Sequence, residues 1–111
     1  MLDSRIQKLL EFLEKDPQDP FLKYALATEY LNIGNHQNAL SYFEDLTTQH
    51  ADYLGTYYHL GRLYEHLNRL EDALRTYQKG MEVAKAQRNA HALSELRGAY
   101  LSATGQDYED D

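Results

Sequence analysis

Histidines and carboxylates are the residues of this 111-residue chain that could hold a metal ion or transfer a proton. His59 and His66 are seven residues apart, and His91 and Glu95 are four apart, so each pair would share one helix face. Zinc needs three or four ligands, and neither pair supplies a third. The chain also has no Cys, which excludes disulfides and Cys-based zinc sites. We therefore predict no metal site and no cofactor.

The sequence contains none of the short motifs that carry common enzyme chemistry. It has no Gly-rich phosphate loop, no G-x-S-x-G and no H-E-x-x-H. Its paired acids, such as Glu71 and Asp72, fall at the ends or on the exposed faces of predicted helices, where carboxylates near a helix start interact favourably with its dipole. We predict that the protein is not an enzyme.

Charge and hydropathy narrow the classes of partner. The formal net charge is −7. Residues 1–55 carry nine acids and four bases (net −5), whereas residues 56–103 carry five acids and seven bases (net +2). This mild positive stretch is too weak to neutralise a row of phosphates, so we expect no nucleic-acid partner. No apolar run is long enough to span a membrane, and the first residues have no signal-peptide pattern, so we expect a cytoplasmic protein.

The elements that would position these side chains are helices. Apolar residues recur at helical spacing, for example at Ile6, Leu9, Leu10 and Leu13, and no segment alternates with a period of two. Turn signals separate these segments, and Asp19 before Pro20 fits an N-cap followed by Pro at the first helical position. The pattern predicts an all-α protein with helices near residues 3–15, 20–33, 36–50, 54–67, 70–87 and 90–104.

An internal repeat relates the middle segments at an offset of 34 residues. It places Leu26, Ala27 and Tyr30 over Leu60, Gly61 and Tyr64, and Ala39, Leu40 and Phe43 over Ala73, Leu74 and Tyr77. The small residues would let two helices approach closely, with aromatic rings filling the space beside them. Ala27, Ala39, Gly61 and Ala73 are therefore predicted to lie at tight contacts between helices.

This pattern resembles the tetratricopeptide repeat family over residues 3–104. The resemblance implies a helical solenoid of about six antiparallel helices, with a single domain over residues 1–105. Within it we expect a partial repeat at 3–17, repeats at 20–53 and 54–87, and a capping helix at 90–104. Five positions depart from the family pattern: Lys23 replaces an aromatic residue, Asn68 replaces the turn Gly, Gly80 stands where Ala is usual, and Ala51 and Lys85 replace Pro.

In tetratricopeptide folds, the first helix of each pair lines a concave groove that binds protein segments. The resemblance implies groove positions at Phe21, Tyr24, Thr28, Tyr58, Arg62, Glu65, His66 and His91, with Ser94 and Gly98 also facing the groove. Tyr24 and Tyr58 could equally be half-buried packing residues. The family's subclass that clamps a terminal carboxylate with Lys and Asn is disfavoured, because the matching positions hold neither residue.

Two functions follow from this interpretation. The first is a protein–protein interaction scaffold that binds a peptide segment or partner protein in its groove. The alternative is a structural module, such as a homodimer, that self-associates through an apolar strip of its terminal helices formed by Leu2, Ile6, Leu10 and Leu13. Residues 106–111 carry four acids and no apolar stripe, so we expect a disordered acidic tail that aids solubility or masks the groove.

Overall fold

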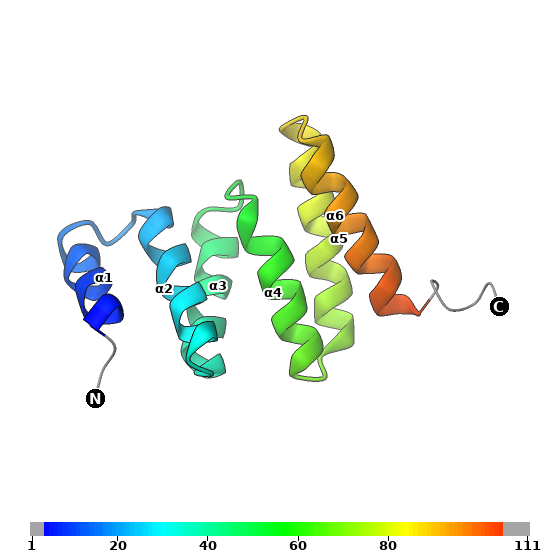
Figure 1. The fold of residues 1–111 in the computed structure, drawn as a ribbon. Coiled ribbons are helices and arrows are strands. Elements are labelled where there is room, and N and C mark those ends of the chain that lie inside the picture. The colour runs from blue at the N-terminus through cyan, green and yellow to red at the C-terminus, as the bar shows by residue number, and fades with distance from the viewer. Residues whose placement is uncertain (1–3, 106–111) are drawn as a thin grey trace. The chain divides into compact units, whose positions relative to one another are not determined.

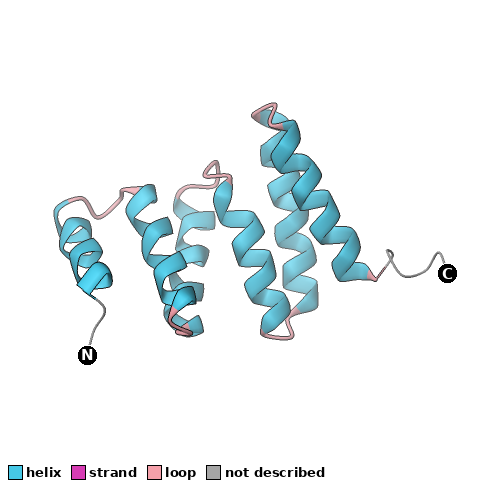
Figure 2. Ribbon diagram, in the orientation of Figure 1, coloured by secondary structure: helices cyan, strands magenta, loops and turns pink. Residues whose placement is uncertain are grey.

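The computed structural model describes residues 4–105 of the chain, and these residues form six α-helices without a β-strand (Figures 1 and 2). The expected disordered tail at 106–111 lies outside the described residues. The all-α prediction is confirmed, and every helix end lies within one residue of its expected position. The helices are α1 (Ser4–Lys15), α2 (Pro20–Asn32), α3 (His36–Gln49), α4 (Gly55–His66), α5 (Leu70–Ala86) and α6 (Ala90–Thr104).

The helices belong to two compact units, which divide between Tyr53 and Leu54. The first unit contains α1, α2 and α3, and the second contains α4, α5 and α6. Within each unit, short turns reverse the chain, so consecutive helices pack antiparallel (Figure 1). Each unit is described by itself below.

The core of the first unit follows the predicted small and large positions. Leu26 and Ala27 of α2 and Ala39 and Phe43 of α3 are fully buried. Asp19 caps α2, because its Oδ1 accepts a hydrogen bond from the Phe21 amide at 2.9 Å. Burial of Ala27 and Ala39 here, and of Gly61 and Ala73 in the second unit, confirms that the four small positions lie inside the helix contacts.

The first helix does not expose the apolar strip that was predicted for it. Ile6 is fully buried against the rest of the unit, and Leu10 and Leu13 are only partly exposed. Leu2 lies outside the described residues. Phe12 is the large apolar side chain that α1 leaves open, with 56% of its surface exposed. The strip is therefore wrong in its composition, because Ile6 points into the core of its own unit.

Lys23 shows how the first unit accommodates a cation at a position where the repeat pattern has an aromatic residue. Only 6% of its side chain is exposed, and its Nζ lies 2.6 Å from the Asp45 carboxylate of α3. The same ammonium donates a hydrogen bond to Gln18 Oε1 at 3.1 Å. A buried charge must be paired and hydrogen-bonded to be tolerated, and these two oxygens meet that requirement.

In the second unit, two glycines give aromatic rings room to pack. A Cβ on Gly61 of α4 would lie 2.2 Å from Cε1 of Tyr77, a fully buried residue of α5. A Cβ on Gly80 of α5 would lie 2.6 Å from Cβ of Tyr57. The departure from the usual Ala at Gly80 therefore has a steric cause, since Tyr57 occupies the space that the Ala methyl would need.

Three helix ends share one turn geometry. In each, the backbone amide two residues after the C-cap donates a hydrogen bond to the carbonyl of the third-last residue of the helix. The three pairs are Asn35 to Tyr30, Arg69 to Tyr64 and Asn89 to Ala84. The residue just before each donor has a positive φ: Gly34 (79°), Asn68 (61°) and Arg88 (56°). Gly and Asn tolerate this left-handed conformation, but a long side chain such as Arg does so only at a cost.

Arg88→Gly is expected to stabilise the second unit by about 0.5–1 kcal/mol. The substitution removes the cost of about 1–2 kcal/mol of a non-Gly residue in the left-handed region, and the greater freedom of Gly in the unfolded chain offsets part of this gain. Urea denaturation followed by circular dichroism measures the difference. Asn68→Gly is the matched comparison and should gain less, because Asn already tolerates the conformation. A lower unfolding midpoint for Arg88→Gly would contradict the argument.

Candidate functional site

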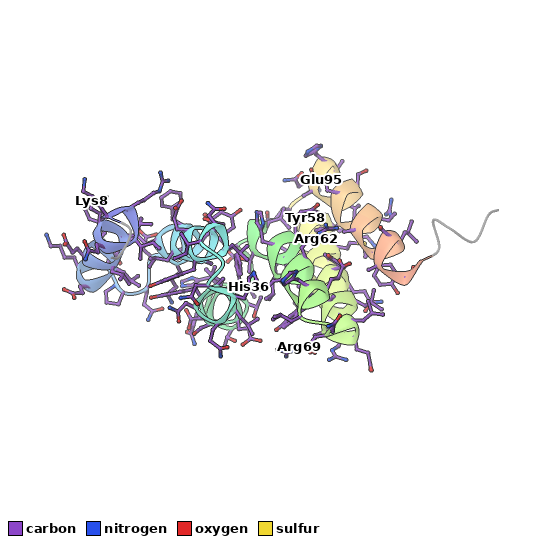
Figure 3. All side chains as sticks on the ribbon, turned by 60° about the horizontal axis from the view of Figure 1, so that its bottom comes forward. Lys8, His36, Tyr58, Arg62, Arg69 and Glu95 are labelled. Atoms are coloured by element: carbon purple, nitrogen blue, oxygen red, sulfur yellow. The ribbon has the colours of Figure 1, made fainter. Side chains whose placement is uncertain are left out.

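A pocket of about 350 Å³ opens between α4 and α6 of the second unit. Its walls combine two large side chains of α4 with a row of mostly small residues on α6: Tyr58, Arg62, Ser94, Glu95, Gly98, Ala99 and Ser102. Figure 3 shows Tyr58 and Arg62 on α4 gathered near Glu95 of α6. We call this the α4–α6 pocket.

Small residues on α6 explain why the pocket is open. On α6, Ser94, Gly98 and Ser102 recur every four residues and so line one face of the helix. Gly98 lies so open that a Cβ added to it would meet no atom within 4 Å. The α6 wall is therefore low, which leaves space above it for a bound group.

Arg62 is the cation of this pocket. Its side chain is exposed, and within residues 4–105 its guanidinium forms no ion pair or hydrogen bond with a carboxylate. A guanidinium offers five N–H donors in a planar fork, which suits a carboxylate or a row of carbonyl oxygens. Beside it, Tyr58 is 39% exposed, and its ring presents apolar surface at low entropic cost.

The hydroxyl of Tyr77 donates a hydrogen bond to Oε2 of Glu65, close to the pocket on its α4 side. Burial of the ring raises the pKa of this hydroxyl well above its ordinary value, and the bond to Glu65 adds to the increase. The Arg62 guanidinium lowers the same pKa, so it lies close enough to interact with this pair. The Glu65 carboxylate is thus engaged with a core residue of α5.

Glu95 supplies the acceptor on the opposite wall. Its carboxylate is 58% exposed and lies 3.5 Å from Nε2 of His91, one helical turn earlier. The pocket thus presents a cation from α4 and an anion from α6, a polarity that suits the N–H and C=O groups of an extended peptide. His91 itself is exposed and does not line the pocket.

The two histidines of α4, His59 and His66, do not line the α4–α6 pocket. His66 is exposed at the end of the helix. His59 is largely covered, and burial lowers the pKa of its imidazole. In the part of the chain that the structure describes, no group of three or more His, Cys, Asp or Glu side chains could hold a metal ion.

The predicted residues of the first unit lie on α2. Phe21 is 61% exposed, whereas Thr28 is partly buried and its hydroxyl donates to the Ala25 carbonyl at 3.0 Å. The Tyr24 ring packs 5.4 Å from the ring of Tyr53 and 6.4 Å from that of Phe43, measured between centroids. Burial raises the pKa of its hydroxyl. For Tyr24 these contacts favour the packing interpretation, and a role in binding stays a prediction.

Comparisons with known proteins identify this architecture. The family model of the tetratricopeptide repeat matches residues 30–96, which is more than half of the chain. The chain belongs to the tetratricopeptide repeat family. No curated protein matches the sequence.

Solved structures of tetratricopeptide repeat domains agree with this assignment. The crystal structure of such a domain protein from Salinibacter ruber is 51% identical over 79% of this chain and 99% of that one, with a TM-score of 0.77. A solution NMR structure of a tetratricopeptide domain protein from the same organism is 52% identical over 80% and 90% of the two chains, also at 0.77. The MamA protein, at 21% identity, 90% and 57% coverage and a TM-score of 0.68, shares the fold.

Family membership confirms the helical repeat that the 34-residue offset predicted. Tetratricopeptide domain proteins are generally non-catalytic scaffolds for protein–protein interactions. Within residues 4–105, no helix is both long enough and apolar enough to cross a membrane.

Three lining residues of the pocket were not among the predicted groove positions: Glu95, Ala99 and Ser102. From the sequence, Glu95 is a candidate metal ligand beside His91 rather than a groove residue. Ser102 stands 36 residues after His66, so the offset that relates α6 to α4 could have placed it in the tetratricopeptide groove. No such signal in the sequence pointed to Ala99. In the structure it is 8% exposed and is mainly a packing residue of α6. Its part in the wall follows from the distance between α4 and α6, which the sequence does not encode locally.

Proposed function

We propose that this protein is a scaffold that binds an extended segment of a partner protein in the α4–α6 pocket. The observation that carries the proposal is the exposed guanidinium of Arg62, which has no ion-pair partner among residues 4–105. It lies beside the exposed Tyr58 and across from the mostly small residues of α6. Arg and Tyr are the residue types most enriched among interface side chains that dominate binding energy. This arrangement supports binding rather than catalysis.

The chemistry of the walls indicates what the segment offers. Arg62 would donate hydrogen bonds to a carboxylate or to main-chain carbonyls, and Glu95 would accept them from main-chain amides. Tyr58 would cover an apolar side chain of the segment. A contribution of Phe21, Tyr24 and Thr28 from the first unit stays a prediction, as do a cytoplasmic location and the absence of a nucleic-acid partner.

Arg62→Ala is expected to weaken binding of a partner segment roughly tenfold, or about 1.4 kcal/mol, within the range for a truncated hot-spot residue. A segment is first selected from a displayed library of random peptides with the wild-type chain as bait. Its affinity for wild type and variant is then measured by isothermal titration calorimetry. Far-UV circular dichroism should be unchanged, because Arg62 is exposed and forms no ion pair within the described residues.

Arg97→Ala is the matched control, since Arg97 is an exposed arginine of α6 that does not line the pocket. It should bind the selected segment as wild type does. Equal affinity for Arg62→Ala and wild type would contradict the proposal. If Phe12→Ala then abolished binding, the segment would bind at the terminal helix α1 instead of the α4–α6 pocket.

A further inference from the structure

A second pocket of about 270 Å³ lies at the turn between α5 and α6. Apolar and basic side chains line it together, and no acidic residue is among them: Ala84, Lys85, Arg88, Asn89, Ala90 and Leu93. We call this the turn pocket. It shares no residue with the α4–α6 pocket. Its volume is close to the lower end of ligand pockets, about 300 Å³, which suits one large side chain with its flanking backbone.

Both cations of the turn pocket are available to a ligand. Lys85 and Arg88 are exposed, and within the described range 4–105 neither forms an ion pair. Asn89 uses its side chain to cap α6, accepting from the Ala92 amide at 3.0 Å, and is therefore occupied. The pocket thus combines an apolar floor, contributed by Ala84, Ala90 and Leu93, with two positive charges at its rim.

A ligand that fits this pocket carries an aromatic or apolar side chain flanked by acids. Residues 106–111 of this chain have that composition, Gln-Asp-Tyr-Glu-Asp-Asp, with Tyr108 between Asp107 and Glu109. The segment has four acidic residues and no basic one, opposite in sign to the rim of the turn pocket.

Distance decides which copy of the segment can bind. Ala90, at the start of α6 and beside the rim residue Arg88, lies fifteen residues before Gly105, which corresponds to about 22 Å at the rise of an α-helix. Tyr108 follows Gly105 by three residues, which span at most about 11 Å when fully extended. Even with the length of its side chain added, Tyr108 therefore cannot be inserted between Lys85 and Arg88 of its own molecule. We propose that the turn pocket binds the acidic segment 106–111 of a second copy of this chain, with Tyr108 inserted between Lys85 and Arg88.

The probe for this proposal is a fluorescently labelled peptide spanning residues 105–111, titrated into the full chain and followed by anisotropy. We expect saturable binding that weakens as salt is added, because both rim charges are exposed and screened by ions. The double variant Lys85→Gln/Arg88→Gly should weaken it about five- to tenfold, as expected for the loss of two exposed ion pairs. The same peptide with Ala in place of Tyr108 should bind several-fold more weakly.

Misfolding cannot imitate this result, because Arg88→Gly alone is expected to raise stability while it lowers affinity for the peptide. Arg97→Gln is the charge-matched control and should leave binding unchanged. Sedimentation equilibrium of the full chain tests the second copy directly. The apparent mass should rise above 12.9 kDa with concentration for wild type, and less so for Arg88→Gly.

Three outcomes would overturn the proposal. The first is a peptide that does not bind at millimolar concentration. The second is binding that survives the Lys85 and Arg88 substitutions but is lost in Arg62→Ala, which would move the segment to the α4–α6 pocket. The third is a wild-type chain that remains monomeric at every concentration. The first and third outcomes say nothing about whether a partner protein binds at Arg62, and the second would make the α4–α6 pocket a binding site for this segment. The proposal for the turn pocket can therefore fail while the proposal for Arg62 holds.

Discussion

Gly61→Ala is expected to destabilise the second unit by about 2–3 kcal/mol, although Ala is the better helix former. The new methyl group would lie 2.2 Å from the Tyr77 ring, which is fully buried and held by its hydrogen bond to Glu65. Overpacking of a dense core typically costs about 1–3 kcal/mol, and a ring that cannot move away places this site at the upper end. The gain of about 1 kcal/mol from helix propensity offsets only part of the clash.

The measurement is the free energy of unfolding from urea denaturation, with Gly98→Ala as the matched control. Gly98 also lies inside a helix, but a Cβ there meets nothing within 4 Å. Gly98→Ala should therefore stabilise the protein by up to about 1 kcal/mol, opposite in sign to Gly61→Ala. Two substitutions with the same sign and size would show that propensity, rather than the Tyr77 ring, governs Gly61.

Asp45→Ala is expected to destabilise the first unit by about 2 kcal/mol. The substitution leaves the Lys23 ammonium, whose side chain is only 6% exposed, with Gln18 Oε1 as its remaining acceptor among residues 4–105. Breaking a fully buried ion pair costs about 3–5 kcal/mol, and the cost is smaller here because 42% of the Asp45 side chain is exposed. Thermal and urea unfolding of the variant measure the loss.

Lys23→Met separates the charge from its packing. An apolar side chain of similar length removes the need for a partner, so we expect it to change stability by less than about 1 kcal/mol. In the Lys23→Met background, Asp45→Ala should then cost little, and the coupling in this double-mutant cycle should be at least about 1 kcal/mol. Glu29→Ala, which breaks the more exposed pair with Arg5, should cost about 0.5 kcal/mol. An Asp45→Ala variant as stable as wild type would contradict this account.

Much of the fold could be predicted because its signals are local and repeated. The 34-residue offset carries Ala27 to Gly61 and Phe43 to Tyr77, and two copies of one small–large pattern require the same helix contact twice. Helix ends were predictable for a similar reason, since Asp19 and Pro20 or Gly34 and Asn35 have their effect within a few bonds of their own position.

The candidate site was predictable only in part. Tyr58, Arg62, Ser94 and Gly98 follow from the resemblance to the repeat family, and the structure brings all four together in one pocket. The sequence could not show that the Glu65 carboxylate would accept a hydrogen bond from the Tyr77 hydroxyl. That outcome depends on the position of a residue twelve places away on another helix.

The sequence by itself therefore determined the helices, their order and the repeat that relates them, because hydrophobic period and turn chemistry operate over short distances. Tertiary structure decided which departures from the repeat are tolerated. Lys23 is buried because Asp45 of α3 pairs with it, and Gly80 lacks a methyl group because Tyr57 fills that space. It also decided that Arg62 is left unpaired among the described residues beside an open wall of α6. The ion pair, the steric contact and the open pocket all depend on distances between side chains of different helices. These distances are set only once the helices have packed.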